Sequence, residues 1–289
     1  MKTMATPEKW PEAADYESDV VVNLPGAGLN GRIQRSCGTE IASSHDYYAE
    51  ARVPSGPWGE LTPKDRSILL KGYSPERRAR TIRIVRPPDF IFDSFEELRT
   101  IADAKGFDGV LQSVSAKTPA QSLRHFAECA RDLYGLGLSG NAGVLGGVRV
   151  NPAGLRTVTT HPTQGRFVGM HVDNWSMVPL RSRHLAPIRI CLNIGSEPRY
   201  FLFVGLTIQR IADTVRGLPG FRSTLGCTDI GRLFLSHCPS YAVFRLKLMP
   251  GEAYIAPTEA IIHDGSTESA VAPDLSLSIR ENMYGPIPR

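Results

Sequence analysis

The sequence predicts a mainly β fold with flanking helices, in which many short strands form an antiparallel sandwich or barrel. From about residue 147 onward, short apolar runs alternate with turn residues, which is typical of antiparallel β proteins. Before that point, two segments carry helix signals: one has a capping residue and a closing glycine, and the other repeats apolar residues every three or four positions. The composition, with 42% hydrophobic and 21% charged residues, is ordinary for a folded globular protein.

The domain organisation is predicted from the length of the chain and from how its composition changes along the sequence. A chain of 289 residues is long enough for one large domain around a proper core. We expect a single domain over 1–289, in which 1–144 form an N-terminal extension with supporting helices and 145–289 form the β-rich core. The first ninety or so residues are rich in Pro, Gly and short polar runs. They are therefore expected to pack on the main body with only a few short strands.

Two helices are expected in the second part of the extension. The first spans 94–105, with Ser94 as its N-cap and Gly106 closing it. The second begins at Thr118-Pro119-Ala120-Gln121, which places a capping residue, a proline and a glutamine at favourable positions. Its apolar stripe ends at Gly135. These helices are expected to support one face of a sheet.

The β-rich core is expected to contain nine strands and one short helix. The helix spans 208–215 and ends before Gly217. The strands are bounded by Gly, Pro, Asn and Ser residues, as in hairpins and sandwich loops. Their expected ranges are 147–150, 155–160, 167–173, 187–195, 199–204, 241–246, 253–256, 260–263 and 275–280.

Charge and cysteine usage exclude several classes of protein. The net charge of +4 is mild and does not require a nucleic-acid partner. The basic run 76–86 alternates with apolar residues and is read as a solvated strand face. No stretch approaches the roughly 20 apolar residues that span a bilayer, and the N-terminus lacks the apolar core of a signal peptide. The five cysteines form no C-x-x-C pair, which argues against a structural zinc site and a disulfide framework. We expect a soluble, cytoplasmic protein.

The pattern with the most chemical content is His171-Val172-Asp173, together with the later His263. Two imidazoles and one carboxylate form the facial triad that holds non-haem Fe(II) and leaves coordination positions open for other ligands. Alternate residues of a strand project to the same face. A strand over 167–173 would therefore direct His171 and Asp173 at one ion. An H-x-D tripeptide is common by chance, so its surroundings decide its meaning.

The last expected strand carries a second chemical feature. Its apolar residues alternate with Ser276, Ser278 and Arg280, which share the opposite face. A guanidinium donates two parallel hydrogen bonds to a carboxylate. Near an Fe(II) site, the carboxylate to expect is the far end of a keto acid that chelates the metal. The alternative for Arg280 is an exposed position on an edge strand.

These residues together resemble the Fe(II)- and 2-oxoglutarate-dependent oxygenase superfamily. The resemblance rests on His171-Val172-Asp173, on Pro250-Gly251-Glu252 and Pro257-Thr258 before His263, and on Arg280. It covers about residues 145–285. It implies a double-stranded β-helix, or jelly-roll, catalytic core over 145–289. His171, Asp173 and His263 would then bind Fe(II), and Arg280 would bind the C5 carboxylate of 2-oxoglutarate.

The resemblance also implies the reaction, with O₂ as a further substrate and with succinate and CO₂ formed from 2-oxoglutarate. Relatives that halogenate replace the triad carboxylate, whereas this chain retains Asp173. Hydroxylation, desaturation or ring formation is therefore expected rather than halogenation. Ser278 and Asn193 are assigned with Arg280 to the co-substrate, and Arg189 is the second choice for its carboxylate. Asn193 could instead satisfy a buried backbone group.

The substrate is expected to be a small molecule, such as an amino acid or a natural-product intermediate. Trp175, two residues after Asp173, is expected at the rim of the site, either packed there or in contact with substrate. No nucleic-acid or membrane partner is expected, and the sequence does not specify an oligomeric state. Two alternatives stay open: a cupin-like metalloenzyme that does not use 2-oxoglutarate, and a non-catalytic jelly-roll binding protein.

Overall fold

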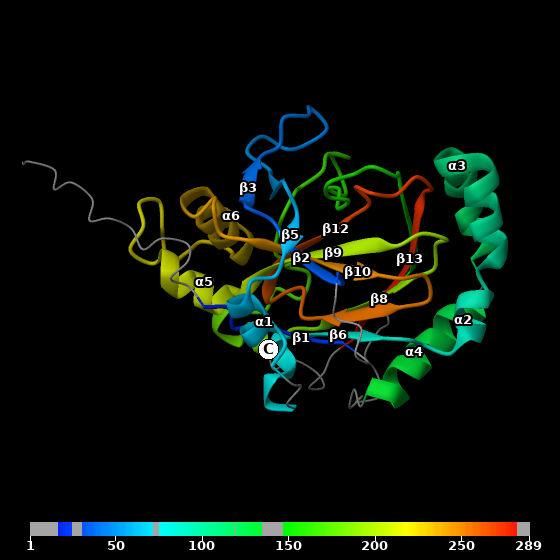
Figure 1. Ribbon diagram of the computed structural model, residues 1–289, viewed down its shortest axis with the longest axis horizontal. Helices are drawn as coiled ribbons and strands as arrows, with labels where there is room; N and C mark the ends of the chain where they lie inside the picture. Colours follow the sequence, from blue (N-terminus) through cyan, green and yellow to red (C-terminus); the bar gives the residue numbers. More distant parts are fainter. Residues whose placement is uncertain (1–16, 25–30, 72–74, 119, 135–146, 282–289) are drawn as a thin grey trace, which may run out of the picture.

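A computed structural model (Figure 1) describes residues 17–24, 31–71, 75–118, 120–134 and 147–281. Its strands form sheets of six, five and two strands, so the fold is mainly β with some helices. The six-stranded sheet has the order β1 (Val21–Asn23), β6 (Thr81–Val85), β11 (Ala253–Ala256), β8 (Ile188–Asn193), β13 (Asp274–Glu281) and β7 (Gly147–Asn151). The five-stranded sheet has the order β12 (Ile261–Ser266), β9 (Arg199–Thr207), β10 (Val243–Leu248), β2 (Ile33–Arg35) and β5 (Gly59–Glu60). The small sheet pairs β3 (Gly38–Ile41) with β4 (Arg52–Ser55).

Six α-helices lie within the described residues. They are α1 (Pro63–Leu69), α2 (Asp89–Asp93), α3 (Glu96–Lys117), α4 (Ala120–Tyr134), α5 (Ile208–Val215) and α6 (Cys227–His237). Two 3₁₀ turns, η2 (Pro75–Arg80) and η3 (Leu180–Leu185), complete the elements. In this described part of the chain, no helix is both long and apolar enough to cross a membrane.

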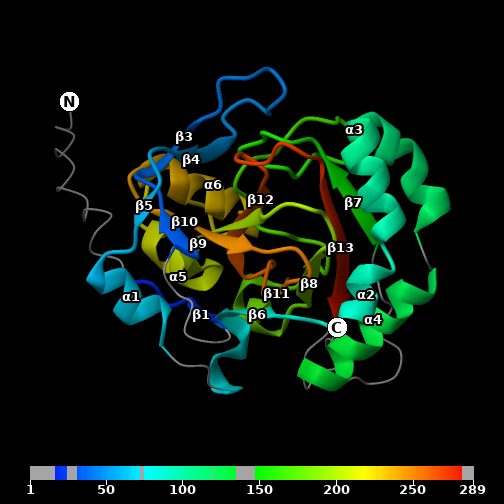
Figure 2. The ribbon, with the colours of Figure 1, turned by 45° about the vertical axis from the view of Figure 1, so that its right-hand side comes forward.

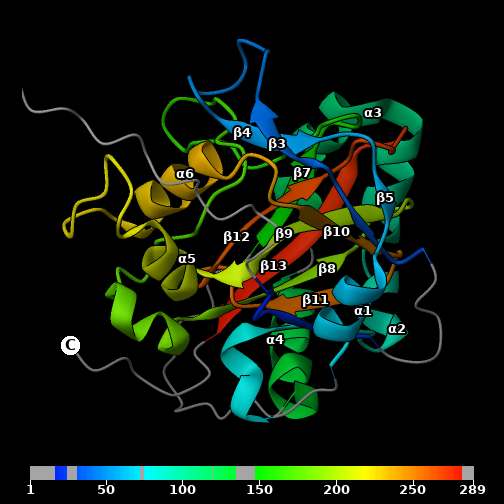
Figure 3. The ribbon, with the colours of Figure 1, turned by 60° about the vertical axis from the view of Figure 1, so that its left-hand side comes forward.

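The two large sheets pack face to face and carry helices on their outer faces. The apolar cluster between them combines side chains of the six-stranded sheet, such as Ile84 and Tyr254, with Phe203 and Leu246 of the five-stranded sheet. Helices α2, α3 and α4 cover the outer face of the six-stranded sheet (Figure 2). Helices α5 and α6 cover the outer face of the five-stranded sheet (Figure 3). The molecule therefore has four layers.

Strand alternation decides which side chains face the space between the sheets. On β13, Leu275, Leu277 and Ile279 are buried against the helices. The intervening Ser276, Ser278 and Arg280 share the opposite face, as the sequence predicted, and this face points inward because successive strand residues face opposite ways. On β8, Arg189 is directly opposite Arg280 in the antiparallel register, so both guanidinium groups lie on the inner face.

The N-terminal segment is built into both large sheets. β1 and β6 lengthen the six-stranded sheet, while β2 and β5 lengthen the five-stranded one. The β1–β6 pair is parallel, and β6 joins the core by antiparallel pairing with β11. The expected extension thus contributes strands to the sandwich itself as well as the helices that cover it.

Most predicted elements of the core are confirmed, and two strands are wrong. Residues 155–160 and 167–173 form no regular strand and take part only in isolated bridges. Gly169, at φ +71°, breaks the extended backbone that the second of these strands would need. Helix α6 was not predicted, although its buried residues Cys227, Ile230 and Phe234 follow a helical spacing.

The two helices predicted in the extension are present, with both boundaries of the first one corrected. Ser94 does not begin α3. It ends α2, where its hydroxyl donates to the Ile91 carbonyl at 2.6 Å. At Gly106 the backbone leaves helical geometry, with φ +65°, but the chain resumes the helix and continues to Lys117. The predicted stop at Gly106 is therefore a kink. The second helix, α4, forms as expected.

Candidate metal centre

His171 and His263 lie side by side because their backbones pair. The His171 N–H donates to the His263 carbonyl at 3.1 Å, and the His263 N–H donates to the His171 carbonyl at 2.8 Å. His263 belongs to β12, whereas His171 reaches this strand through an isolated antiparallel bridge. The centroids of the two imidazole rings are 4.8 Å apart. Backbone pairing thus brings together two histidines that are distant in the sequence.

The segment that carries His171 is fixed to β4 by a close approach at Gly169. The Met170 N–H donates to the Arg52 carbonyl at 2.7 Å. A Cβ on Gly169 would lie 2.5 Å from that same carbonyl oxygen, and φ at this position is +71°. Only glycine fits both conditions without a shift of the backbone. Gly169 therefore helps to set the position of the ligand two residues later.

We expect Gly169→Ala to destabilise the protein more than Gly165→Ala. Gly165 also has a positive φ, +66°, but an added Cβ there would meet nothing within 4 Å. Its variant isolates the left-handed backbone cost of about 1–2 kcal/mol, whereas Gly169→Ala adds the collision with Arg52. Urea denaturation measures both, and Gly169→Ala should also weaken metal binding. Equal losses of unfolding free energy would contradict this account.

Asp173 is held in place from behind by a buried ion pair. Its N–H donates to the Thr258 carbonyl at 3.2 Å, and its carbonyl accepts from the Arg183 guanidinium at 3.1 Å. Arg183 pairs with the Glu259 carboxylate at 3.0 Å, and both side chains are almost fully buried. Glu259 also accepts the Ser176 N–H at 3.1 Å. The loop after Asp173 is therefore locked to the segment before β12.

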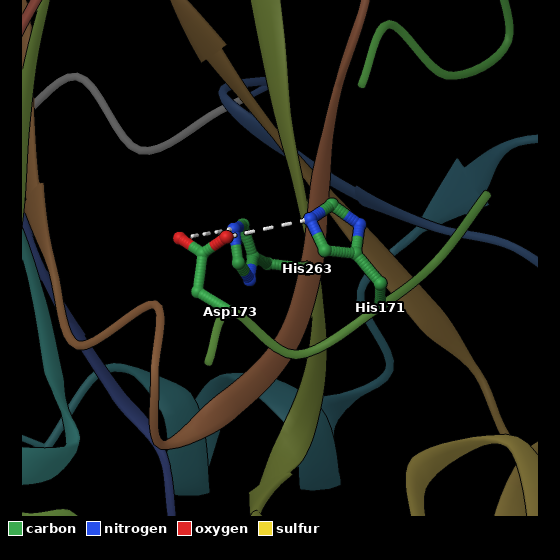
Figure 4. Close-up of side chains that lie close together, drawn as sticks. All are labelled: His171, Asp173 and His263. Atoms are coloured by element: carbon green, nitrogen blue, oxygen red, sulfur yellow. Dashed lines mark ion pairs between the residues drawn. The ribbon is translucent and has the colours of Figure 1, made fainter. Parts of the chain in front are cut away.

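The three predicted ligands converge in the structure (Figure 4). One ligand atom from each of His171, Asp173 and His263 lies within 4.8 Å of the others. Each histidine Nε2 is 3.6 Å from a carboxylate oxygen of Asp173. Two ligand atoms that share one ion at about 2.1 Å are themselves about 3–4 Å apart. The arrangement therefore fits a single metal ion with only small adjustments.

The hydrogen bonds of the imidazole rings leave the correct nitrogens free. His171 Nδ1 is 2.9 Å from the Gly169 carbonyl, and His263 Nδ1 is 3.3 Å from the Ile261 carbonyl. A carbonyl accepts only from a protonated nitrogen, so both rings carry Nδ1–H. In both rings Nε2 is therefore the nitrogen on the side of Asp173, and it can bind a metal ion once it carries no proton. This is the tautomer that a metal-binding imidazole needs.

The charges around the triad favour a cation. Burial alone would lower the pKa of His171, but hydrogen bonds and charge from Asp173 and Asp264 raise it to about 10. Burial, aided by the charges of His171 and Arg189, lowers the pKa of His263 to about 3. Despite its burial, the Asp173 carboxyl has a pKa well below its usual value, chiefly because of Arg189 and His263. Positive charge is thus stabilised beside the carboxylates while His263 stays neutral, as a bound metal ion requires.

Two arginines flank Asp173 on the inner face of the six-stranded sheet. Arg189 contacts Asp173 Oδ2 at 2.8 Å, and Arg280 lies 3.7 Å from the same oxygen. Two like charges directly opposite each other on neighbouring strands repel. A single carboxylate, which would also face the metal, offers limited compensation for both. The two guanidinium groups are therefore suited to bind a further anion beside the triad.

Trp175 lies between the triad and the surface. Its indole N–H donates to Asp173 Oδ1 at 3.1 Å, and the Arg280 guanidinium lies 4.4 Å from the centre of its ring. The residue is 62% exposed, which places it at the rim as predicted from the sequence. Its ring therefore contacts both Asp173 and Arg280 at the exposed edge of the triad.

The other residues assigned to the co-substrate have different surroundings. Ser278 is half-buried on the inner face, two residues before Arg280, and is paired with Cys191. Asn193 is fully buried, and its amide donates to the carbonyls of Glu197 and Leu248 and accepts the Gly195 N–H. These bonds satisfy backbone groups at the β8–β9 turn and at the end of β10, which is the alternative that the sequence left open for Asn193.

Sequence reasoning missed Arg183, Glu259 and Asp264. All three are buried: Arg183 donates to the Asp173 carbonyl, Asp264 lies beside the His171 ring, and Glu259 acts through its ion pair with Arg183. Glu259 and Asp264 lie within a mostly apolar stretch on either side of His263, where a carboxylate needs a partner to be buried. That contrast was the signal available in the sequence. It could not identify the partners.

Comparison with known proteins adds little to what the geometry of the site shows. No protein-family model matches the chain, and no curated protein matches it. Among solved structures, the chain is similar to the apo structure of the Kdo hydroxylase KdoO, a non-heme Fe(II) alpha-ketoglutarate-dependent dioxygenase. The identity is 12%, the TM-score is 0.36, and the match covers 70% of this chain and 79% of that one. A likeness this low does not carry a fold or a reaction over to this chain.

Proposed function

We propose that this protein is an Fe(II)- and 2-oxoglutarate-dependent oxygenase that hydroxylates a small molecule, such as an amino acid or a natural-product intermediate. The observation that carries the proposal is the convergence of His171, Asp173 and His263 beside two inward arginines, Arg189 and Arg280. The triad offers two imidazole nitrogens and one carboxylate, the ligand set of non-haem Fe(II) oxygenases. The arginines offer a place for the free carboxylate of a keto acid.

The order of the strands supports a double-stranded β-helix as the core. From β7 onward, the chain passes repeatedly between the two large sheets: β8 belongs to the six-stranded sheet, β9 and β10 to the five-stranded one, and β11, β12 and β13 alternate again. The bridge between His171 and His263 adds the segment before β8 to the edge of the five-stranded sheet. Such alternation is what a jelly roll would show, with the triad beside the edge strand β12.

Within this proposal, each residue has a specific task. His171 and His263 would bind the ion through Nε2, and Asp173 through its carboxylate. When bound, Fe(II) supplies the coordination positions at which a keto acid and O₂ react to oxidise a C–H bond. Arg280 would bind the far carboxylate of 2-oxoglutarate, with Trp175 orienting its guanidinium. The apolar interior between the sheets would exclude water from the reacting atoms.

The test is anaerobic addition of Fe(II) and 2-oxoglutarate to the pure protein. We expect the weak visible metal-to-ligand charge-transfer band of the chelate, followed by succinate formation when air is admitted. Metal binding without this band and without succinate would favour a metalloenzyme that does not use 2-oxoglutarate. The absence of metal binding altogether would favour a non-catalytic binding protein.

We expect Arg280→Gln to raise the 2-oxoglutarate concentration needed for half-maximal band intensity by roughly 10–100-fold, because a hydrogen-bonded ion pair is worth about 1.5–3 kcal/mol. Affinity for the metal alone should change much less, since Arg280 is 3.7 Å from Asp173. The matched variant is Arg189→Gln, on the strand opposite. If Arg189→Gln raises the requirement and Arg280→Gln does not, Arg189 binds the co-substrate.

A further inference from the structure

We propose that Asp264 is a positioning residue for the metal ligand His171: it accepts the Nδ1–H of that imidazole and so directs Nε2 at the ion. This inference rests on the proposed metal site. Asp264 directly follows His263 on β12. One strand would therefore supply both a ligand and the carboxylate that orients the other histidine.

The two oxygens of the Asp264 carboxylate have unequal surroundings. Oδ1 accepts the N–H groups of Val158 and Thr159 at 3.3 and 3.1 Å, the Thr159 hydroxyl at 2.8 Å and the Gly265 N–H at 2.7 Å. These four bonds fix the carboxylate. Oδ2 is buried and has no hydrogen-bond partner among the described residues.

The orphaned oxygen lies next to His171. Oδ2 is 3.6 Å from His171 Nδ1, slightly beyond hydrogen-bond length, and the Asp264 side chain has no exposed surface. A buried carboxylate oxygen without a donor is costly. A small rotation of the imidazole, of the size that metal binding to Nε2 requires, would close this gap. The Nδ1–H, which also donates to the Gly169 carbonyl at 2.9 Å, would then be shared with this oxygen.

The surroundings of Nδ1 permit only one tautomer. The Gly169 carbonyl, 2.9 Å from Nδ1, is also an acceptor, so both neighbours require Nδ1–H. His263 differs, because its Nδ1 contacts the Ile261 carbonyl at the longer distance of 3.3 Å. A carboxylate behind a metal-bound imidazole fixes its orientation and increases the basicity of the coordinating nitrogen. We infer that His171 is the more strongly donating of the two histidines.

The experiment compares Co(II) binding to the full-length protein, followed by visible absorption, in wild type, Asp264→Asn and Thr159→Val. In Asp264→Asn, the amide oxygen can keep the Oδ1 bonds, but its NH₂ group then faces Nδ1–H, donor against donor. We expect Co(II) affinity to fall about 10–100-fold and the absorption bands to shift. Thr159→Val removes one bond to Oδ1 and leaves Oδ2 intact, so its affinity should stay within about twofold.

Several results would overturn the assignment. One is Asp264→Asn binding Co(II) with unchanged affinity and spectrum. Another is Thr159→Val losing as much affinity as Asp264→Asn, which would make Asp264 only an anchor for the 155–160 loop. In ¹⁵N-labelled, Zn(II)-loaded wild type, NMR should show a protonated Nδ1 on His171, and a bare Nδ1 would overturn the proposal even if the variant does not fold. A wild-type protein that binds neither metal would reject the metal site itself.

Discussion

Asp173→Ala should abolish turnover of 2-oxoglutarate and lower metal affinity by more than about 100-fold, because even an outer partner of a metal ligand is worth roughly 10–100-fold. Asp173 is the one anionic ligand of the triad and receives contacts from both histidines, Arg189 and Trp175. Without Asp173, two imidazoles and two nearby guanidinium groups have no carboxylate ligand between them to compensate their positive charge. Metal titration and succinate formation measure the two effects.

The fold should survive this change. Arg189 loses its partner, but its side chain is 23% exposed, so water can solvate the guanidinium. Circular dichroism should therefore match that of wild type. Asp229→Ala is a suitable control, because Asp229 is an exposed aspartate on α6 that pairs loosely with Arg232 at 3.8 Å. This variant should retain both metal binding and succinate formation. Full succinate formation by Asp173→Ala would contradict the proposed role of the carboxylate.

Arg183→Met should reduce the free energy of unfolding by about 3–5 kcal/mol, the usual cost of removing one partner of a buried ion pair. Arg183 and Glu259 are almost completely buried, and burial already raises the pKa of Glu259. Without Arg183, the Glu259 carboxylate keeps, among the described residues, only its hydrogen bonds from Ser176. The Asp173 carbonyl also loses its donor. We therefore expect weaker metal binding alongside the lower stability.

The matched control is Arg216→Met, which breaks an exposed pair with Asp213 of similar length, 2.8 Å. That change should alter stability by at most about 0.5 kcal/mol. The double variant Arg183→Met/Glu259→Gln removes the uncompensated charge and should recover part of the loss. Urea denaturation of the four proteins is the measurement. Similar losses for Arg183→Met and Arg216→Met would mean that the buried pair does not hold the Asp173 loop.

The sequence was a good guide where local patterns carry the structure. The alternation on β13 placed Arg280 on a polar face, and the structure puts that face beside the triad. The period of three and four residues predicted α4, and a short helix closed by Gly217 was predicted where α5 lies. Both patterns work because they depend on neighbours in the chain. The helix α6 carried the same signal at Cys227, Ile230 and Phe234 and was overlooked.

The sequence predicted that His171 and Asp173 lie close together because they share one face of a strand. The structure does bring them together, but through different contacts. Their segment is not a regular strand, since Gly169 leaves extended geometry. The two ligands converge because His171 pairs with His263 and Asp173 is tied to Thr258. Those contacts join parts of the chain that are far apart in the sequence. Alternation along a strand could not have revealed them.

The sequence by itself determined the chemical inventory: two histidines, one aspartate and an arginine on the polar face of the last strand. Residue type and short-range spacing are local properties, so they can be read without a fold. The tertiary structure alone decided the supporting contacts, with Arg189 on Asp173, Arg183 paired with Glu259, and Asp264 behind His171. Burial makes these contacts matter, because a charge away from water needs a partner, and only the folded chain determines which partner it meets.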